Sequence, residues 1–157
     1  MKKLLLGLLV VFTIASCVSY KYGTTIKLDG KKYARAYIEY KSNKVLVNKV
    51  NKQAKVSLWD SVKVADKLKY TPKGGYIYAH VYASTIGAAN TKYWTCIVSD
   101  KNGKEIHRET GKSSIANVPN PNDPNRLWSN LMLVRLDTNI TDMFKVRIVD
   151  ELSSVAN

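Results

Sequence analysis

The nine residues from Tyr76 to Ser84 alternate between two kinds of side chain without a break. Because successive side chains of a β-strand point to opposite faces, this period of two predicts a strand with one buried face. We expect the inward set to be Ile77, Ala79, Val81 and Ala83. We expect the outward set to be Tyr76, Tyr78, His80 and Tyr82. The stretch limits the fold, since such a strand needs partners in a sheet and a layer packed on its apolar face.

Other short strands are predicted on both sides of this one, each bounded by turn residues. Asp29-Gly30 predicts a hairpin between 24–28 and 32–40, because Asp-Gly accepts the positive φ angles of a tight turn. The remaining predicted strands are 45–50, 93–99, 104–110, 127–136 and 143–150. Strand 76–84 and the two that follow it read as an antiparallel meander. Short strands at this spacing predict an all-β fold, either an antiparallel β-sandwich or a small barrel.

Two stretches do not fit a simple strand pattern. Residues 54–69 suit both a helix face and a strand period, and the β-branched Val62 and Val64 favour the strand, with one short helix as the open alternative. Pro72-Lys73-Gly74-Gly75 ends this segment. Residues 111–126 contain three prolines and little to bury, so we expect a long loop, which is usually functional or mobile.

The N-terminus has the form of an export signal. Lys2 and Lys3 precede an apolar run from Leu4 to Ala15, and the run closes with Ile14-Ala15-Ser16-Cys17. This closing motif resembles the lipobox of bacterial lipoproteins. The resemblance covers about twenty residues and implies that Cys17 is acylated and becomes the mature N-terminus. We therefore expect a signal peptide over 1–16, a lipidated N-terminus and spacer over 17–23, and one β-rich domain over 24–157.

Other readings of the N-terminus remain. An ordinary secretory signal would be cut without lipidation, and Cys17 and Cys96 could then form a disulfide. A spanning helix needs roughly twenty apolar residues, more than this run offers. The lipoprotein resemblance implies a membrane location through a lipid anchor. Val18-Ser19 lacks the acidic residue linked to inner-membrane retention, which favours the outer membrane, facing the periplasm or the cell surface.

Basic residues are concentrated in the first half of the predicted mature chain. Residues 18–73 hold 14 Lys and Arg against four acids, a net charge of +10, whereas residues 74–157 hold nine against eight, a net charge of +1. Basic residues gain on the order of 1 kcal/mol each near an anionic surface. We expect attraction to a membrane or to an anionic envelope polymer, with a merely solvated surface as the alternative. An exported chain rarely meets nucleic acid, so we expect no nucleic-acid partner.

Few residues suit catalysis or metal binding. Cys96 alternates with Trp94 and Val98, which predicts a buried and inert thiol. His80 and His107 are the two histidines. His107 has Glu105 and Glu109 at strand spacing, an arrangement that fits a metal but equally a solvated edge strand. We find no catalytic motif and predict no catalytic residue, metal or cofactor.

Aromatic residues offer more for binding. The outward set of strand 76–84, with Tyr33, Arg35 and Tyr37 on a neighbouring strand, would form an aromatic face flanked by lysines. Tyrosine supplies rigid area with a polar tip, which suits sugars or a protein partner. The alternative is that tyrosine is simply favoured in strands.

Two functions from different classes follow. The first is a non-enzymatic envelope lipoprotein that binds a glycan, a polyanion or a protein partner. The second is a secreted inhibitor of, or an enzyme acting on, envelope substrates, with His80 or His107 at its centre. The basic charge counts against an inhibitor, because the enzymes that it would target are commonly basic too.

Overall fold

The computed structural model describes residues 20–28, 31–122, 126–140 and 142–154, and side chains from residue 36 to residue 152. The predicted leader, Cys17 and the Asp29-Gly30 turn lie outside the described residues. The strands are β1 (Tyr20–Leu28), β2 (Lys31–Lys41), β3 (Gly75–Ala83), β4 (Trp94–Asp100), β5 (Glu105–Thr110), β6 (Trp128–Leu136) and β7 (Phe144–Asp150). The helices are α1 (Asn43–Val56), α2 (Ser61–Lys69) and the short α3 (Glu151–Ser154).

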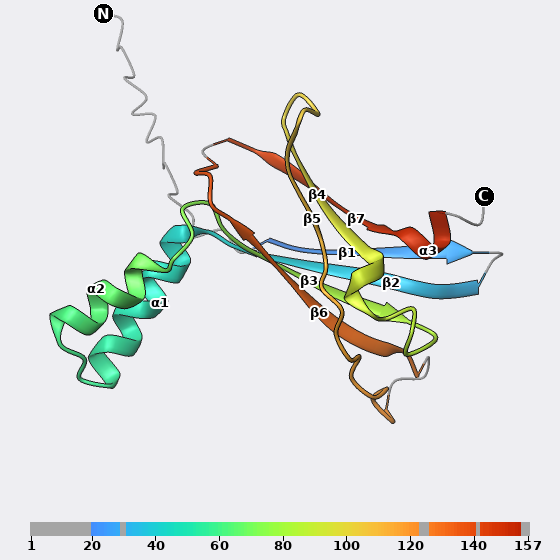
Figure 1. The fold of residues 1–157 in the computed structure, drawn as a ribbon, viewed down its shortest axis with the longest axis horizontal. Coiled ribbons are helices and arrows are strands. Elements are labelled where there is room, and N and C mark those ends of the chain that lie inside the picture. The colour runs from blue at the N-terminus through green and yellow to red at the C-terminus, as the bar shows by residue number, and fades with distance from the viewer. Residues whose placement is uncertain (1–19, 29–30, 123–125, 141, 155–157) are drawn as a thin grey trace, which may run out of the picture.

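The strands form two antiparallel sheets that pack face to face (Figure 1). The first, sheet A, has the order β1-β2-β3-β6, and the second, sheet B, has the order β5-β4-β7. The predicted all-β antiparallel sandwich is confirmed. The predicted hairpin is confirmed as the β1–β2 pair, although β1 starts at Tyr20, inside the stretch expected to be spacer.

The predicted meander is correct for the antiparallel β4–β5 pair and wrong for β3, which does not pair with β4. Strand β3 pairs with β2 and β6 in sheet A, whereas β4 pairs with β5 and β7 in sheet B. The chain therefore crosses between the sheets after β3, after β5 and after β6. The first and last of these crossings let the apolar faces of β3 and β4, and of β6 and β7, meet across the core instead of side by side within one sheet.

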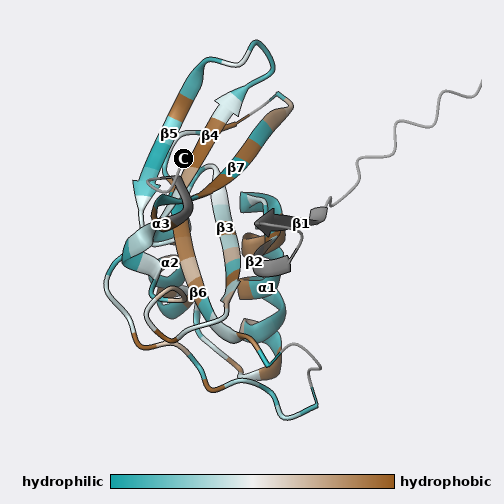
Figure 2. Ribbon diagram, turned by 90° about the vertical axis from the view of Figure 1, so that its right-hand side faces the viewer, coloured by the Kyte–Doolittle hydropathy of each residue, from teal (hydrophilic) through white to brown (hydrophobic). Residues whose placement is uncertain are grey.

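The core lies between the two sheets. Sheet A contributes the inward residues of β3, fully buried as predicted, together with those of β2 and β6. Sheet B contributes Trp94, Cys96 and Val98, with Phe144, Val146 and Ile148 partly buried against them. Figure 2 shows β4 and β7 with hydrophobic bands and β5 mostly hydrophilic, as expected for an edge strand. Burying Trp94 and the β-branched side chains is the main stabilising term for the sandwich.

Two helices fill most of the region from 43 to 69, which corrects the expected strand over 45–50 and favours the helix that was the open alternative for 54–69. The expected strand over 45–50 lies inside α1, and 54–69 contains the end of α1 and the whole of α2 instead of a strand. Each helix begins at a capping side chain: Ser42 Oγ accepts from the Val45 amide at 3.4 Å, and Asp60 Oδ1 accepts from the Lys63 amide at 2.7 Å. These bonds satisfy amides that have no partner within the helix, so they favour helix over strand.

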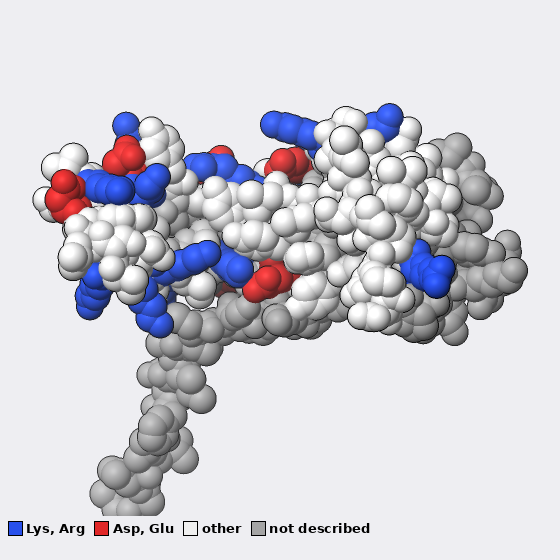
Figure 3. Space-filling view, turned by 90° about the horizontal axis from the view of Figure 1, so that it is seen from below, with Lys and Arg blue, Asp and Glu red and all other residues white. Residues whose placement is uncertain are grey.

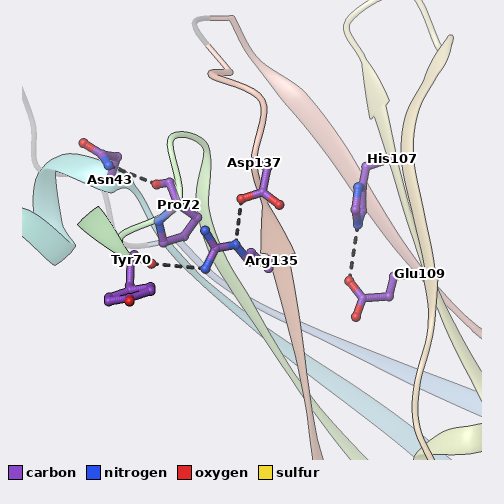
Figure 4. Close-up of polar contacts among 7 residues, drawn as sticks. All are labelled: Asn43, Tyr70, Pro72, His107, Glu109, Arg135 and Asp137. Atoms are coloured by element: carbon purple, nitrogen blue, oxygen red, sulfur yellow. Dashed lines mark hydrogen bonds and ion pairs between the residues drawn. The ribbon is translucent and has the colours of Figure 1, made fainter. Parts of the chain in front are cut away.

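The two helices form a hairpin that projects beyond one end of the sandwich (Figure 1). Figure 4 shows two polar contacts at its base: Asn43 Nδ2 donates to the Pro72 carbonyl at 2.9 Å, which joins α1 to the turn after α2, and Arg135 of β6 donates to the Tyr70 carbonyl at 3.1 Å, which ties the base to sheet A. Gly75 follows with φ +95°, and an added Cβ there would collide with the Lys41 carbonyl oxygen. A close approach of two backbones thus fixes where the hairpin joins β3.

The opposite end of the sandwich carries the predicted long loop over 111–126. A second cluster of small buried residues, Ala83, Ala89 and Ala116, holds the start of this loop. The buried Asn130 amide donates to the Ala89 carbonyl at 3.1 Å and to Ser114 Oγ at 2.9 Å. The described part of the loop makes one isolated bridge, between Asn117 and Ser129.

Candidate functional site

The outer face of sheet A carries most of the residues that the sequence singled out. The inward set of β3 is buried, whereas Tyr76, Tyr78, His80 and Tyr82 are all partly exposed on the other side. Their neighbours across β2 and β6 are fixed by the antiparallel registers. In Figure 1, α1 and α2 extend past the end of the sheet and do not cover this face.

Three rows of side chains cross the central strands of this face. The rows are Tyr37–His80–Leu131, Glu39–Tyr78–Leu133 and Lys41–Tyr76–Arg135. Residues opposite one another on adjacent strands lie on the same face and within contact distance. We call these nine residues the outer face. It is aromatic along its middle strand, aliphatic towards β6 and cationic at the row nearest the helical hairpin.

Ring contacts order the aromatic side chains. The rings of Tyr37 and His80 lie 5.5 Å apart and are tilted by 51°, and those of Tyr76 and Tyr78 lie 6.2 Å apart at 63°. Lys41 Nζ sits 4.4 Å from the centre of the Tyr78 ring and 3.4 Å from Glu39 Oε1. Tilted pairs and a cation over a ring are favourable arrangements for aromatic groups. The face is therefore preformed, not a set of independent surface tyrosines.

The sequence prediction is partly tested by these positions. Tyr37, Tyr76, Tyr78, His80 and Tyr82 come together as predicted. Arg35 is opposite Tyr82 in the backbone register, and Tyr33 precedes the part of β2 that pairs with β3, which starts at Ala34. The side chains of Tyr33 and Arg35 lie outside the described residues.

Sequence reasoning missed the contribution of β6. Leu131 and Leu133 are 45% and 48% exposed although they are large and apolar. The run Leu131-Met132-Leu133-Val134 is apolar on both faces of its strand. This pattern indicates that the outer face of the strand contacts something other than solvent. The neighbours of β3 are set by the crossings between sheets, so this signal alone does not place the two leucines beside Tyr78 and His80.

The second histidine lies elsewhere, on β5 of sheet B. Its Nε2 is 3.4 Å from Glu109 Oε2 (Figure 4), but Glu105 instead pairs with Arg108, at 2.6 and 2.9 Å. That ion pair holds the pKa of Glu105 below its ordinary value through the hydrogen bond from Arg108. Within the described residues, no three His, Cys, Asp or Glu side chains gather as a metal site would need.

The buried cysteine is placed as predicted. Cys96 has no exposed surface and packs in the core. Burial, with a smaller effect from the negative charge of Glu109, raises the pKa of Cys96 to about 12. Because the thiolate is the reactive form, this residue is unsuited to nucleophilic chemistry.

Comparisons with known proteins do not add a family. No family model matches the sequence, and no match was found among curated proteins or solved structures. None of the helices in the described part of the chain is both long and apolar enough to cross a membrane.

Proposed function

We propose that the protein is a non-enzymatic lipoprotein of the cell envelope, anchored through an acylated Cys17, which binds an envelope glycan on the outer face of sheet A. The observation that carries the binding proposal is the ordered set of three rows on this face. The anchor is inferred from Ile14-Ala15-Ser16-Cys17 and its resemblance to the lipobox. We place the anchor in the outer membrane, with the domain facing the periplasm or the cell surface.

The chemistry of the outer face favours a glycan. Sugar rings expose patches of C–H groups that stack on aromatic faces, and their hydroxyls pair with the polar tips of tyrosines. Leu131 and Leu133 extend the apolar strip, while Lys41 and Arg135 supply positive charge at one end. A glycan with carboxylate or phosphate substituents would use both parts. A simple polyanion would use the cations alone, and a protein partner would need a larger apolar area.

The same contacts support a binding role over an enzymatic one. His80 stacks against Tyr37, and His107 is paired with Glu109 on the other sheet, so the two histidines are not in one site. The thiol of Cys96 is buried in the protonated form. We therefore propose that the protein has no catalytic residues and needs no cofactor.

The anchor is tested by mass spectrometry of the mature N-terminus and by cell fractionation. We expect acyl groups on Cys17 and a membrane-bound protein, and we expect Cys17→Ser to move the protein to a soluble fraction. An acyl-free native N-terminus, or a Cys17→Ser protein that still pellets with membranes, would contradict the anchor.

The binding face is tested by retention on purified peptidoglycan and on lipopolysaccharide. Tyr78→Ala and Tyr37→Ala should each weaken retention about tenfold, since each removes a stacking ring worth roughly 1–2 kcal/mol. Tyr70→Ala is the matched control, because that residue is 60% exposed at the base of the helical hairpin and contacts Arg135 of the outer face through its backbone carbonyl, which the substitution keeps. Equal retention of all three variants would reject the face as the binding site.

A further inference from the structure

The end of the helical hairpin exposes large apolar side chains. Val56, Leu58 and Val62 are 81%, 90% and 76% exposed, and Trp59 lies among them. We call these four residues the hairpin tip. Lys63 Nζ lies 5.0 Å from the centre of the Trp59 ring, so a cation is held beside the only aromatic residue of the tip. Water is a poor environment for such a cluster, which points to a partner.

Leu58 occupies a position that normally belongs to glycine. The Trp59 amide donates to the Ala54 carbonyl at 2.9 Å, the bond that closes a Schellman motif at the end of α1. Leu58 therefore takes the left-handed backbone conformation, with φ 50°. A side chain with a Cβ in this conformation costs about 1 kcal/mol relative to glycine. The backbone of the hairpin has this unfavourable conformation even though the Leu58 side chain is almost fully exposed and gains little from burial.

Cations surround the tip. Residues 43–70 contain seven lysines and two aspartates, a net charge of +5, and all seven lysines are exposed. Figure 3 shows Lys and Arg side chains gathered at the hairpin end of the molecule. The lysines are Lys44, Lys49, Lys52, Lys55, Lys63, Lys67 and Lys69. Exposed aliphatic residues and a tryptophan among lysines are typical of a segment that sits at an anionic bilayer surface.

The start of the described chain lies at the same end of the sandwich. Tyr20 is opposite Tyr40 in the β1–β2 register, and Tyr40 is two residues before Ser42, the cap of α1. Cys17 is three residues before Tyr20 in the sequence, and three residues of extended chain span at most about 11 Å. Helix α1 has 14 residues and is about 21 Å long. A lipid on Cys17 would therefore bring the bilayer within reach of the tip.

We propose that the hairpin tip is a second membrane contact: Leu58 and its apolar neighbours insert into the interface of an anionic bilayer, and the surrounding lysines bind lipid phosphates. The proposal rests on the proposed function only in placing Cys17 at the bilayer. It assigns a role to the basic first half of the chain and to the strained Leu58.

The test measures binding of the chain from residue 17 onward, carrying Cys17→Ser, to vesicles of phosphatidylglycerol and phosphatidylcholine. We expect binding that weakens with added salt and is absent with phosphatidylcholine alone. Leu58→Gly should weaken it about tenfold, as expected for loss of one inserted leucine. Val62→Ser, which leaves the strained turn untouched, should also weaken it. Ile115→Ser is the matched control, since Ile115 is 88% exposed in the loop at the other end.

Two further measurements separate a binding effect from misfolding. Leu58→Gly relieves the left-handed backbone, so its melting temperature should equal or exceed that of the parent chain. Lipids brominated on their acyl chains should quench tryptophan fluorescence in the parent chain. Trp59→Phe should abolish that quenching, since Trp94 is buried in the core and Trp128 packs against the alanine cluster at the opposite end of the sandwich.

The proposal is overturned if the parent chain ignores anionic vesicles at low salt, if Leu58→Gly and Val62→Ser bind as the parent does, or if Trp59 is not quenched. These assays contain neither an acyl chain nor a glycan, so such a failure leaves the proposed function standing. Conversely, a native N-terminus without lipid would remove the proposed anchor and leave the vesicle result unchanged.

Discussion

The hydroxyl of Tyr40 donates a 2.7 Å hydrogen bond to the carbonyl oxygen of Gly74. Tyr40 is the last residue of β2 that pairs with β1, and Gly74 lies in the turn before β3. The Tyr40 ring also meets Phe144 of β7 edge-on, with ring centres 4.9 Å apart. One side chain thus joins both sheets to the base of the helical hairpin.

Tyr40→Phe should destabilise the protein by about 1 kcal/mol, the net value of a typical hydrogen bond, because the ring packing is kept. Burial also raises the pKa of Tyr40 above its ordinary value. The folded state therefore favours the neutral phenol, and stability is lost as pH rises above about 10, where unfolded tyrosines ionise. Urea unfolding at neutral and alkaline pH measures both effects. The Phe variant should lose less stability on alkalinisation than the parent, and an equal loss would contradict this account.

Gly75→Ala should destabilise by about 3 kcal/mol, because its φ of +95° is strained for alanine and the new Cβ meets the Lys41 carbonyl. Gly103→Ala is the matched control. Its φ is +85° but nothing lies within 4 Å of the added Cβ, so we expect only the conformational cost, about 1 kcal/mol. Chemical denaturation of both variants checks the difference. Equal losses would show that the backbone contact at the hairpin base is unimportant.

Cys96 should resist thiol reagents in the folded protein. With a pKa of about 12, it is almost entirely protonated at pH 8, and it has no exposed surface. Labelling with a chromogenic disulfide in a Cys17→Ser background should be slow without denaturant and complete once the chain unfolds. Rapid labelling under native conditions would mean that the core between the sheets opens readily.

Leu133→Thr should weaken glycan retention with little change in stability, because Leu133 is 48% exposed on the outer face. Threonine is β-branched and favoured in strands, and it removes apolar contact area. Ile106→Thr is the matched control on β5, since Ile106 is 44% exposed on the other sheet. Retention assays paired with thermal melts separate binding from folding. Equal retention by both variants would exclude β6 from the binding surface.

Local patterns predicted the strands well where the alternation was unbroken. Strand β3 follows its sequence period along its whole length, because one side faces the core. Segment 45–50 was wrongly predicted as a strand, since Val45, Val47 and Val50 match strand preference. The helix signal was present but weaker: Ser42 as a cap and the stripe of Leu46, Val50 and Ala54 at a spacing of four.

The composition of the outer face was only partly predictable, for a different reason. Period two correctly separates Tyr78 and His80 from the core, but it does not state which strand lies beside β3. That neighbour is β6, about fifty residues later, because the chain crosses to sheet B and back. Leu131, Leu133 and Arg135 therefore join the face through long-range topology, which no local pattern encodes.

Strand β3 runs for nine residues, about 30 Å, from Gly75 beside the helical hairpin to Ala83 at the alanine cluster. If the proposed lipid anchor and the hairpin tip both contact the bilayer at the Gly75 end, the strands of the sandwich would run roughly perpendicular to the membrane. The row of Lys41, Tyr76 and Arg135 would then lie at the lowest level, and the row of Tyr37, His80 and Leu131 about 13 Å higher. A polymer lying parallel to the membrane would then bind along the side of the sandwich, at a height above the bilayer that the length of β3 determines.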